Sequence, residues 1–369
     1  MKDTHKPATS TTAKDKGPAG FTDEERAAMR EHAQELKTAA RRGPRAARAG
    51  GASDVLVKIA QMPAPDRALG AALGEVRQVD LSAGTIRYRE RGCGQPIVFL
   101  HGIVANGAIW RRVSPRLVHG YRCIVPDWPL GSHELGLHEG IDLSLPGIAD
   151  LVGEFCAALE LEDVTLVAND TGGAVAQWVA IRHSQRIGRL VLTPCDAFEN
   201  FLPPVLRHLQ LFGRRPAGLW LVGQTLRFRV IQRLPIAFGR LTVRPIDRWV
   251  MDSYTRPLRT NSAVRRDFAA LVRAISSRYT MEAAQRLPTF NKPALVVWSL
   301  DDRLFPLAHG HRLAKLLPQG RLDVIDDAGA FIPEDQPERL AALIGGFISE
   351  TVAKPGPPNE VTASGMGRQ

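Results

Sequence analysis

The sequence predicts an α/β protein whose core is a mainly parallel, doubly wound sheet with a helical insertion. Two observations indicate this fold class. From about residue 75 onward, short β-rich apolar runs alternate with helical patterns, and the alternation stops between residues 197 and 287. Strands that alternate with helices form parallel sheets with helices on both faces. The 369 residues are enough for one large domain with an insertion or for two domains.

Composition narrows the functional classes. Hydrophobic residues make up 44% of the chain and charged residues 23%, as in ordinary globular enzymes. No apolar run reaches the length of about 18 residues that predicts a membrane span. The first residues, MKDTHKPATSTTAKDKG, also lack the apolar segment of a signal peptide. We therefore expect a cytoplasmic protein that has no membrane partner.

Cysteines and charge indicate neither a metal site nor a nucleic-acid partner. The cysteines are widely spaced and predict free thiols: Cys93, Cys123, Cys156 and Cys195. The net charge of +10 comes largely from scattered arginines. Because no aromatic residues are interleaved with them in a stripe, solvated helices are the expected explanation, and no nucleic acid is expected as a partner.

The N-terminal region precedes the alternating pattern. Residues 1–20 are polar and expected to be disordered, whereas residues 21–74 are expected to form a helical extension. Thr22 and Glu25 form a capping box that opens its first helix, and further helices are expected at 54–61 and beyond.

The core elements are predicted in order from residue 75. Residues 76–81 and 85–90 flank the turn Ser82-Ala83-Gly84 and predict an antiparallel hairpin. Further strands are predicted from apolar runs at 96–100, 121–125, 164–167, 189–192, 294–298 and 321–325. Helical patterns separate most of these strands, at 109–117, 145–159, 173–183, 307–317 and 337–348.

These elements divide the chain. The core is expected to comprise residues 75–196 and 288–350, followed by a disordered tail at 351–369. Residues 197–287 are helical in pattern and interrupted by prolines. An insertion of this size between two strands, here after the sixth, predicts a cap over the carboxyl edge of the sheet.

The segment LVANDTGGAVAQ, residues 166–177, has the pattern of a strand, a sharp turn and a small-residue helix. Ala168 and Gly172 are small, as such a turn requires two residues before and two after its apex. Asp170 is then the apex residue, with its side chain exposed above the sheet. An aspartate in an ordinary turn before glycine is the alternative interpretation.

Residues 75–350 resemble the α/β-hydrolase fold, and within it the branch of haloalkane dehalogenases and epoxide hydrolases. The landmarks occur in the family's order: Leu100-His101-Gly102, VPDWPLGSH, the turn at Asp170, the insertion, VVWSLDDRLFP and AGAFIPEDQPE. In addition, FTDEERAAMREHAQELK and VLVKIAQMPAPDRAL resemble the opening of a small iron-chaperone-like domain of unknown function. Only that opening is present, so no activity is inferred from it.

The resemblance implies a mechanism and a set of site residues. Asp170 would be a nucleophile that attacks an sp3 carbon and forms an alkyl-enzyme ester, which water activated by histidine then cleaves. The backbone N–H groups of Ile103 and Thr171 would form the oxyanion hole. The acid would be Asp302, or alternatively Asp196, with Glu199 beside it. No cofactor and no metal are implied, and the substrate would be small and apolar or halogenated.

Several positions depart from the family pattern. Ala330 stands where the histidine base is expected, and an alanine cannot accept a proton. Thr171 stands where haloalkane dehalogenases place tryptophan and fluoroacetate-type dehalogenases arginine. Ile103-Val104-Ala105 also lacks the proline that most epoxide hydrolases carry after the His-Gly pair. The site is therefore expected to be incomplete.

Other histidines are alternative bases. His133 lies in the loop beside the expected pocket mouth, and His208 lies in the cap. A surface or packing role is expected for each of these and for His101, His183, His309 and His311, with His133 and His208 the strongest alternatives. Five of the six tryptophans, at 110, 128, 178, 220 and 249, are expected to pack in the core or cap.

The sequence leaves three functions open. The first is a hydrolase that uses Asp170 with a relocated or absent base. The second is a catalytically impaired hydrolase-fold protein that binds a small apolar ligand. The third is an interaction protein whose N-terminal helices recruit a partner. Neither the substrate nor the oligomeric state follows from the sequence.

Overall fold

A computed structural model of the chain describes residues 64–352. The expected disorder at 1–20, the expected helices up to residue 61, and the tail from 353 lie outside this part, and so does the recruitment hypothesis that depends on those helices. The first described helix is α3 (Ala64–Leu73). Its residues Leu69 and Leu73 are buried in the same hydrophobic core as the sheet.

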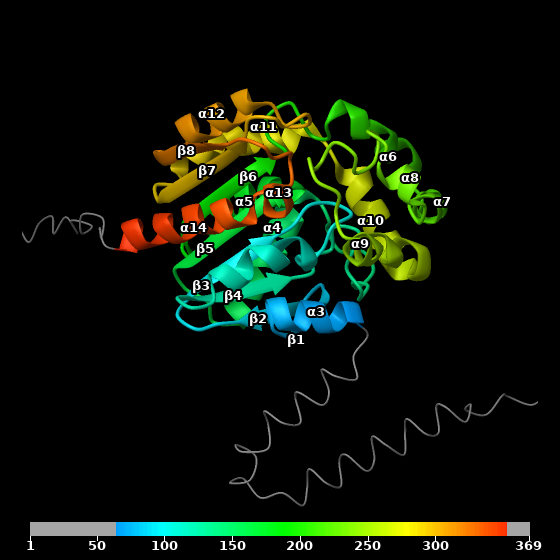
Figure 1. Cartoon of the computed structure of the whole chain (residues 1–369), viewed down its shortest axis with the longest axis horizontal. Helices are drawn as coiled ribbons and strands as arrows, with labels where there is room; N and C mark the ends of the chain where they lie inside the picture. The colour runs from blue at the N-terminus through cyan, green and yellow to red at the C-terminus, as the bar shows by residue number, and fades with distance from the viewer. Residues whose placement is uncertain (1–63, 353–369) are drawn as a thin grey trace, which may run out of the picture. The chain divides into compact units, whose positions relative to one another are not determined.

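Within residues 64–352, eight strands form one sheet in the order β1-β2-β4-β3-β5-β6-β7-β8 (Figure 1). Strands β1, β2 and β4 pair antiparallel, and all other neighbours pair parallel. The predicted mainly parallel sheet is therefore confirmed. The strands are β1 (Glu75–Leu81), β2 (Gly84–Arg91), β3 (Gln95–Leu100), β4 (Tyr121–Pro126), β5 (Val164–Asp170), β6 (Ile187–Cys195), β7 (Pro293–Ser299) and β8 (Gln319–Ile325).

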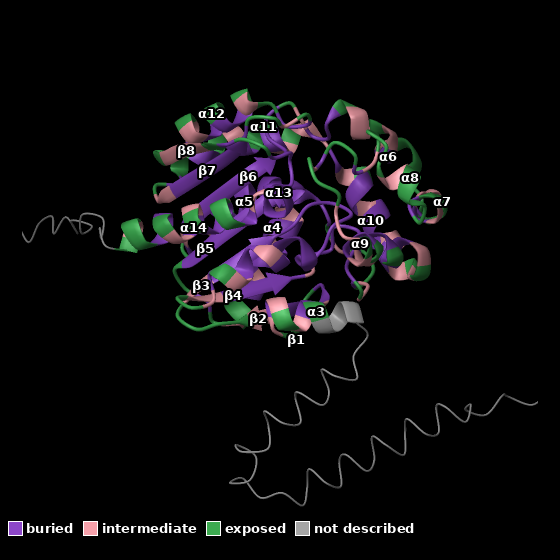
Figure 2. Cartoon of the chain, in the orientation of Figure 1, coloured by how far each residue is buried: buried purple, intermediate pink, exposed green. Residues whose placement is uncertain are grey.

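Helices cover the sheet, and their packing follows the predicted alternation. Helix α5 packs on β5 and β6, α4 packs on α5, and α12 packs on β7 and β8. Figure 2 shows that the central strands are buried along their length, as expected for strands covered on both faces. The helices that flank the sheet are α4 (Leu145–Ala158), α5 (Thr171–Arg182), α12 (Leu307–Leu316), α13 (Ile332–Asp335) and α14 (Pro337–Val352).

The predicted helix at 109–117 is wrong in type. The segment forms two 3-10 helices, η1 (Gly107–Arg112) and η2 (Ser114–Arg116). Pro115 lies inside the predicted helix, and its ring removes the N–H that would continue an α-helical ladder. The apolar periodicity was satisfied instead by burial of Ile109 and Trp110 in the tighter turns.

A helical cap follows β6, as predicted. Helices α6, α7, α9 and α10 pack against one another at one end of the sheet (Figure 1). The helices α9 and α10 bury apolar residues such as Tyr254 and Phe268 on their inner faces. The segment comprises η3 (Pro204–Leu206), α6 (Arg207–Gly213), α7 (Pro216–Thr225), α8 (Arg229–Gln232), α9 (Arg248–Thr260), α10 (Ser262–Ala274), α11 (Ser277–Arg286) and η4 (Leu287–Thr289).

Two glycines allow α5 to start directly against the sheet. A Cβ atom on Gly172 would lie 2.4 Å from the carbonyl oxygen of His101, and one on Gly173 would lie 2.3 Å from the Cβ of Cys195. Larger residues would therefore push the helix away from β3 and β6. This close approach holds Asp170, the residue before α5, at the carboxyl edge of the sheet.

The described residues contain no helix whose length and apolar character would let it cross a membrane. The cysteines among them are free thiols, and all except Cys93 are buried.

Candidate active site

Asp170 occupies the apex of a sharp turn between β5 and α5. Its backbone has φ 57° and ψ −136°, a strained conformation for a residue other than glycine. Gly102 lies so close that a Cβ atom there would be 2.3 Å from Asp170 Oδ1. The turn therefore projects the carboxylate toward the loop that follows β3, where the sequence places the oxyanion hole.

Backbone N–H groups hold this carboxylate. The N–H of Thr171 donates to Asp170 Oδ1 at 2.5 Å, and the N–H of Ile103 donates to the same carboxylate. Burial raises the pKa of Asp170, while these donors and the Thr171 side chain act in the opposite direction. The neighbouring Val104 has φ 50°, unusual for a β-branched residue, and its N–H donates to the Leu130 carbonyl at 2.9 Å. The Val104 contact fixes the loop, and the Ile103 N–H is directed at Asp170.

Asp196 follows β6 and contacts the turn through Thr171. The Thr171 hydroxyl donates to Asp196 Oδ2 at 2.7 Å, whereas Oδ1 is buried without a hydrogen-bond partner among residues 64–352. Burial and the nearby charge of Asp170 raise the pKa of Asp196 well above its ordinary value. The single hydroxyl donor does not offset this effect of burial and charge on Asp196.

Asp302 lies in the loop after β7. Its Oδ1 accepts the N–H groups of Leu304 and Phe305, at 2.7 and 3.0 Å. Its Oδ2 is buried and unpaired within the described part of the chain. Burial, together with the charge of Asp170, raises the pKa of Asp302 to about 7. Asp301 is different, because it is exposed and its Oδ2 accepts the Asp327 N–H at 3.0 Å.

Ala330, at the position expected for histidine, is fully buried beside the turn. Its carbonyl accepts a hydrogen bond from Asn169 Nδ2 at 2.8 Å, and the same amide donates to Thr193 Oγ1 at 2.9 Å. Sequence analysis did not single out Asn169. The sequence did carry a signal for this residue, because Asn169 is a polar amide in a strand whose residues are mostly apolar. It ties the loop of Ala330 to the turn of Asp170.

His101 packs and does not titrate near neutral pH. Its Nδ1–H donates to the Gly102 carbonyl, and its Nε2 accepts the Trp128 N–H, both at 2.9 Å. Burial lowers the pKa of His101 to about 4. The ring is therefore neutral and orders the loop.

Other candidate histidines are engaged elsewhere. Nε2 of His133 lies 3.4 Å from Asp267 on α10. His309 pairs with Glu199 at 3.3 Å, and His183 pairs with Asp150 at 2.9 Å. His311 is exposed on α12.

A cavity of about 280 Å³ lies between Asp170 and the cap. Among its lining residues, the only titratable side chains are Asp170 and His208, and no tryptophan takes part. Nδ1 of His208 lies 3.0 Å from the Val205 carbonyl. The remaining lining is mostly apolar and includes Ile103, Val104, Leu206, Leu209, Phe212, Leu221, Val222, Leu226, Ile231, Ile236, Phe238 and Leu241.

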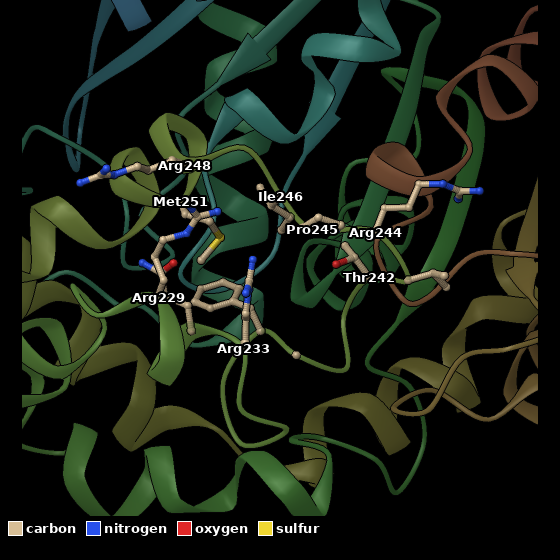
Figure 3. A pocket seen from close by; sticks show the side chains of 12 residues that line it. Arg229, Arg233, Thr242, Arg244, Pro245, Ile246, Arg248 and Met251 are labelled. Carbon is tan, nitrogen blue, oxygen red and sulfur yellow. The ribbon is translucent and has the colours of Figure 1, made fainter.

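A second hollow, of about 310 Å³, opens beside this cavity and shares Phe238 with it. Figure 3 shows arginines around it, including Arg229, Arg233 and Arg248. Asp170 does not line it. The apolar cavity, and not the arginine-lined hollow, is therefore the candidate site. Residues 64–352 hold no cluster of three His, Cys, Asp or Glu side chains suited to a metal ion.

The strand order, the sharp turn at Asp170 and the cap after β6 together define an α/β-hydrolase. A model of the alpha/beta hydrolase family matches residues 97–343, and the chain belongs to this family.

Relatives place the chain within the family more closely. Haloalkane dehalogenase 2 of Mycobacterium tuberculosis is 30% identical over 282 residues, 73% of this chain and 93% of that protein. Cis-3-alkyl-4-alkyloxetan-2-one decarboxylase of Shewanella oneidensis is 27% identical over 282 residues, 72% and 86% of the two chains. The solved haloalkane dehalogenase DbeA of Bradyrhizobium elkani shares the fold, with a TM-score of 0.63, 22% identity, and coverage of 76% and 99%. The chain belongs to the haloalkane dehalogenase-like branch.

Proposed function

We propose that Asp170 is the nucleophile of a dehalogenase-like reaction on a small apolar substrate. One observation carries the proposal: the Asp170 carboxylate, held by two backbone N–H groups, lines an otherwise mostly apolar cavity under the cap. A carboxylate oxygen attacks an sp3 carbon as the bond to the leaving group breaks, which forms an alkyl-enzyme ester. Water then cleaves this ester and releases the alcohol.

The N–H groups of Ile103 and Thr171 act in the second half of the reaction. When water attacks the ester carbonyl, negative charge develops on the carbonyl oxygen. Donors that already contact the Asp170 carboxylate need no rearrangement to stabilise that charge. The positive end of α5 also favours the ionised form of Asp170 before the first step.

Leaving-group stabilisation is assigned to His208. An in-line displacement places the leaving group on the far side of the carbon from Asp170, toward the cap, and His208 is the other titratable group in the cavity. Its Nδ1–H donates to the Val205 carbonyl, which leaves Nε2 to face a ligand. Nε2 is then the atom of His208 that would contact a departing halide or oxygen anion.

Replacing His208 with glutamine is expected to slow ester formation by about 10- to 100-fold, because a hydrogen bond to a charged group contributes about 1.5–3 kcal/mol. Rapid-quench mass spectrometry of ester formation measures this. His311→Gln on exposed α12 is the matched control and should form the ester at the original rate. Equal rates in both variants would remove His208 from the reaction.

The proposed nucleophile is tested by intact mass after incubation with 1-bromobutane. We expect one added butyl group on Asp170, because Ala330 supplies no base to hydrolyse the ester quickly. Asp170→Asn should abolish the adduct, whereas Asp252→Asn, at an exposed carboxylate of α9, should retain it. If no bromoalkane or epoxide forms an adduct, but apolar ligands raise the melting temperature, the alternative function of ligand binding is favoured.

A second candidate function is decarboxylation of a β-lactone, the activity named for the Shewanella relative. The alanine at position 330, in place of a histidine base, favours decarboxylation. This reaction consumes no water and so needs no base to activate a water molecule. Asp170 would attack C4 of the oxetan-2-one and break the ring C–O bond, leaving a free carboxylate on C3. Loss of CO2 would then form the C3=C4 bond and return the electrons of the ester C–O bond to Asp170.

This candidate is tested with a cis-3,4-dialkyl oxetan-2-one as substrate. Gas chromatography should detect the alkene in an amount equal to the lactone consumed, and Asp170→Asn should produce none. Hydroxy acid in place of alkene would show that the lactone is hydrolysed and would exclude decarboxylation.

A further inference from the structure

Asp302 is a buried carboxylate that has no role in the proposed chemistry so far. Buried polar atoms are normally hydrogen-bonded, because an unpaired one loses its hydration without compensation. The family position of Asp302 implies that it orients a histidine, yet residue 330 is alanine. Its Oδ2 accordingly has no hydrogen-bond partner among residues 64–352.

The surrounding contacts fix where this oxygen lies. Two backbone N–H groups hold Oδ1, so the carboxylate cannot turn freely. Asp301 binds the Asp327 N–H in the loop after β8, and Ala330 in that same loop binds Asn169 of the turn. The loop after β8 therefore contacts both the loop of Asp302 and the turn of Asp170. At residue 330 in this loop, a methyl group stands where the family pattern has an imidazole.

We propose that Asp302 is the general base of ester cleavage, with Oδ2 taking the proton of the hydrolytic water. This inference rests on the proposed alkyl-enzyme ester at Asp170. The water oxygen bonds to the ester carbonyl carbon of Asp170 as one proton passes to Asp302, directly or through one bridging water. The C–O bond between that carbon and the alkoxy oxygen then breaks. The alkoxide takes the proton back from Asp302, which releases the alcohol and leaves Asp170 as the carboxylic acid. Loss of this second water proton to solvent restores the Asp170 carboxylate.

The charges in the site suit Asp302 better than Asp196. Burial and the charge of Asp170 raise the pKa of Asp196 well above its ordinary value, against a single hydroxyl donor. The pKa of Asp302 is raised only to about 7, near the optimum for a general base at neutral pH. Esterification also neutralises Asp170, which removes one cause of the raised pKa. Asp302 therefore ionises more readily once its task begins.

The experiment separates ester formation from ester decay. Full-length protein is alkylated with 1-bromobutane, freed of reagent by gel filtration, and followed by intact mass. In Asp302→Asn the ester should still form, but its decay should slow by tenfold or more. Asp252→Asn, at an exposed carboxylate of α9, is the control and should decay at the original rate.

The pH dependence gives a readout that a structural role would not move. The titratable groups around Asp302 are Asp170, which the ester neutralises, and the thiol of Cys195, whose pKa burial raises far above the range tested. Decay in the original chain should accelerate as the pH rises and Asp302 ionises, and this acceleration should vanish in Asp302→Asn. If the ester decays at the same rate and with the same pH profile in the original chain and in Asp302→Asn, Asp302 is not the base, while the proposed nucleophile is unaffected. Absence of any ester in the original chain would overturn the proposed nucleophile and the inference with it.

Discussion

Replacing Ala330 with histidine is expected to accelerate ester cleavage by about 10²–10⁴-fold, the usual contribution of a general base. An imidazole at this position would lie beside the turn, since the Ala330 carbonyl already binds Asn169. Its Nδ1–H would find an acceptor in the unpaired Oδ2 of Asp302. The substitution would thus place an imidazole base beside the ester and pair a buried carboxylate oxygen in one change.

Single-turnover decay of the butyl ester and steady-state release of bromide measure this gain. Ala330 is fully buried, so thermal unfolding must show that the variant remains folded and that the ester still forms. Ala330→Gln is the matched control, because it adds bulk without a base. The double variant Ala330→His/Asp302→Asn should lose much of the gain. A folded, alkylated Ala330→His protein with unchanged decay would mean that Asp302 and Asp170 are not placed for hydrolysis.

The free energy of unfolding is expected to fall as the pH rises from about 4 to about 7, and Asp302 is one identifiable cause. The pKa of Asp302 is about 7 in the folded chain, compared with an ordinary value of 3.8. Between these values the folded state holds a proton that the unfolded state has released. The stability that Asp302 contributes is therefore fully present below the lower pKa. It is lost as the pH rises through the upper pKa, and the free energy of unfolding falls by up to about 4 kcal/mol.

Urea unfolding at pH 5 and at pH 8 measures this loss. In Asp302→Asn, the difference in the free energy of unfolding between pH 5 and pH 8 should shrink by the contribution of Asp302, because an amide does not titrate. The rest should remain, since the pKa values of Asp170 and Asp196 are raised in the same direction. Asp301→Asn should keep the full difference. If both variants respond to pH as the original chain does, the Asp302 carboxyl is not desolvated in the folded protein.

This destabilisation fits a functional interpretation of the cluster. The charge of Asp170 raises the pKa of both Asp196 and Asp302, and amides or apolar residues would give a more stable core. Proteins commonly retain such groups where activity requires them. The cluster therefore supports a chemical role for Asp170 more strongly than a purely structural one.

The fold could be predicted from the sequence because its signals are local. Each buried strand is a continuous apolar run between turn residues, and each flanking helix has its own apolar period. The turn at Asp170 could be recognised in the same way, since small residues on both sides of the apex are a requirement of the backbone. The prediction of an α-helix at 109–117 was wrong because the same apolar period also fits 3-10 turns. Pro115 interrupts the α-helical hydrogen bonds in this segment.

The candidate site was predictable only in part, since its contacts join residues far apart in the chain. The substitution at Ala330 was visible because its neighbours match the family pattern. No pattern indicated that the hydroxyl of Thr171 reaches Asp196, or that Asn169 binds the Ala330 carbonyl. These contacts depend on how β5, β6 and the loop after β8 meet at the sheet edge.

The order of residues by itself decided the architecture, the position of Asp170 at a sharp turn, and the absence of histidine at residue 330. All three follow from steric and hydrophobic requirements that act within a few neighbouring residues. Two features follow only from the tertiary structure. His208 shares a cavity with Asp170, and one buried oxygen of Asp302 has no hydrogen-bond partner within residues 64–352. The reason is that desolvation, pKa and hydrogen bonding depend on distances through space, which the packing of sheet and cap creates.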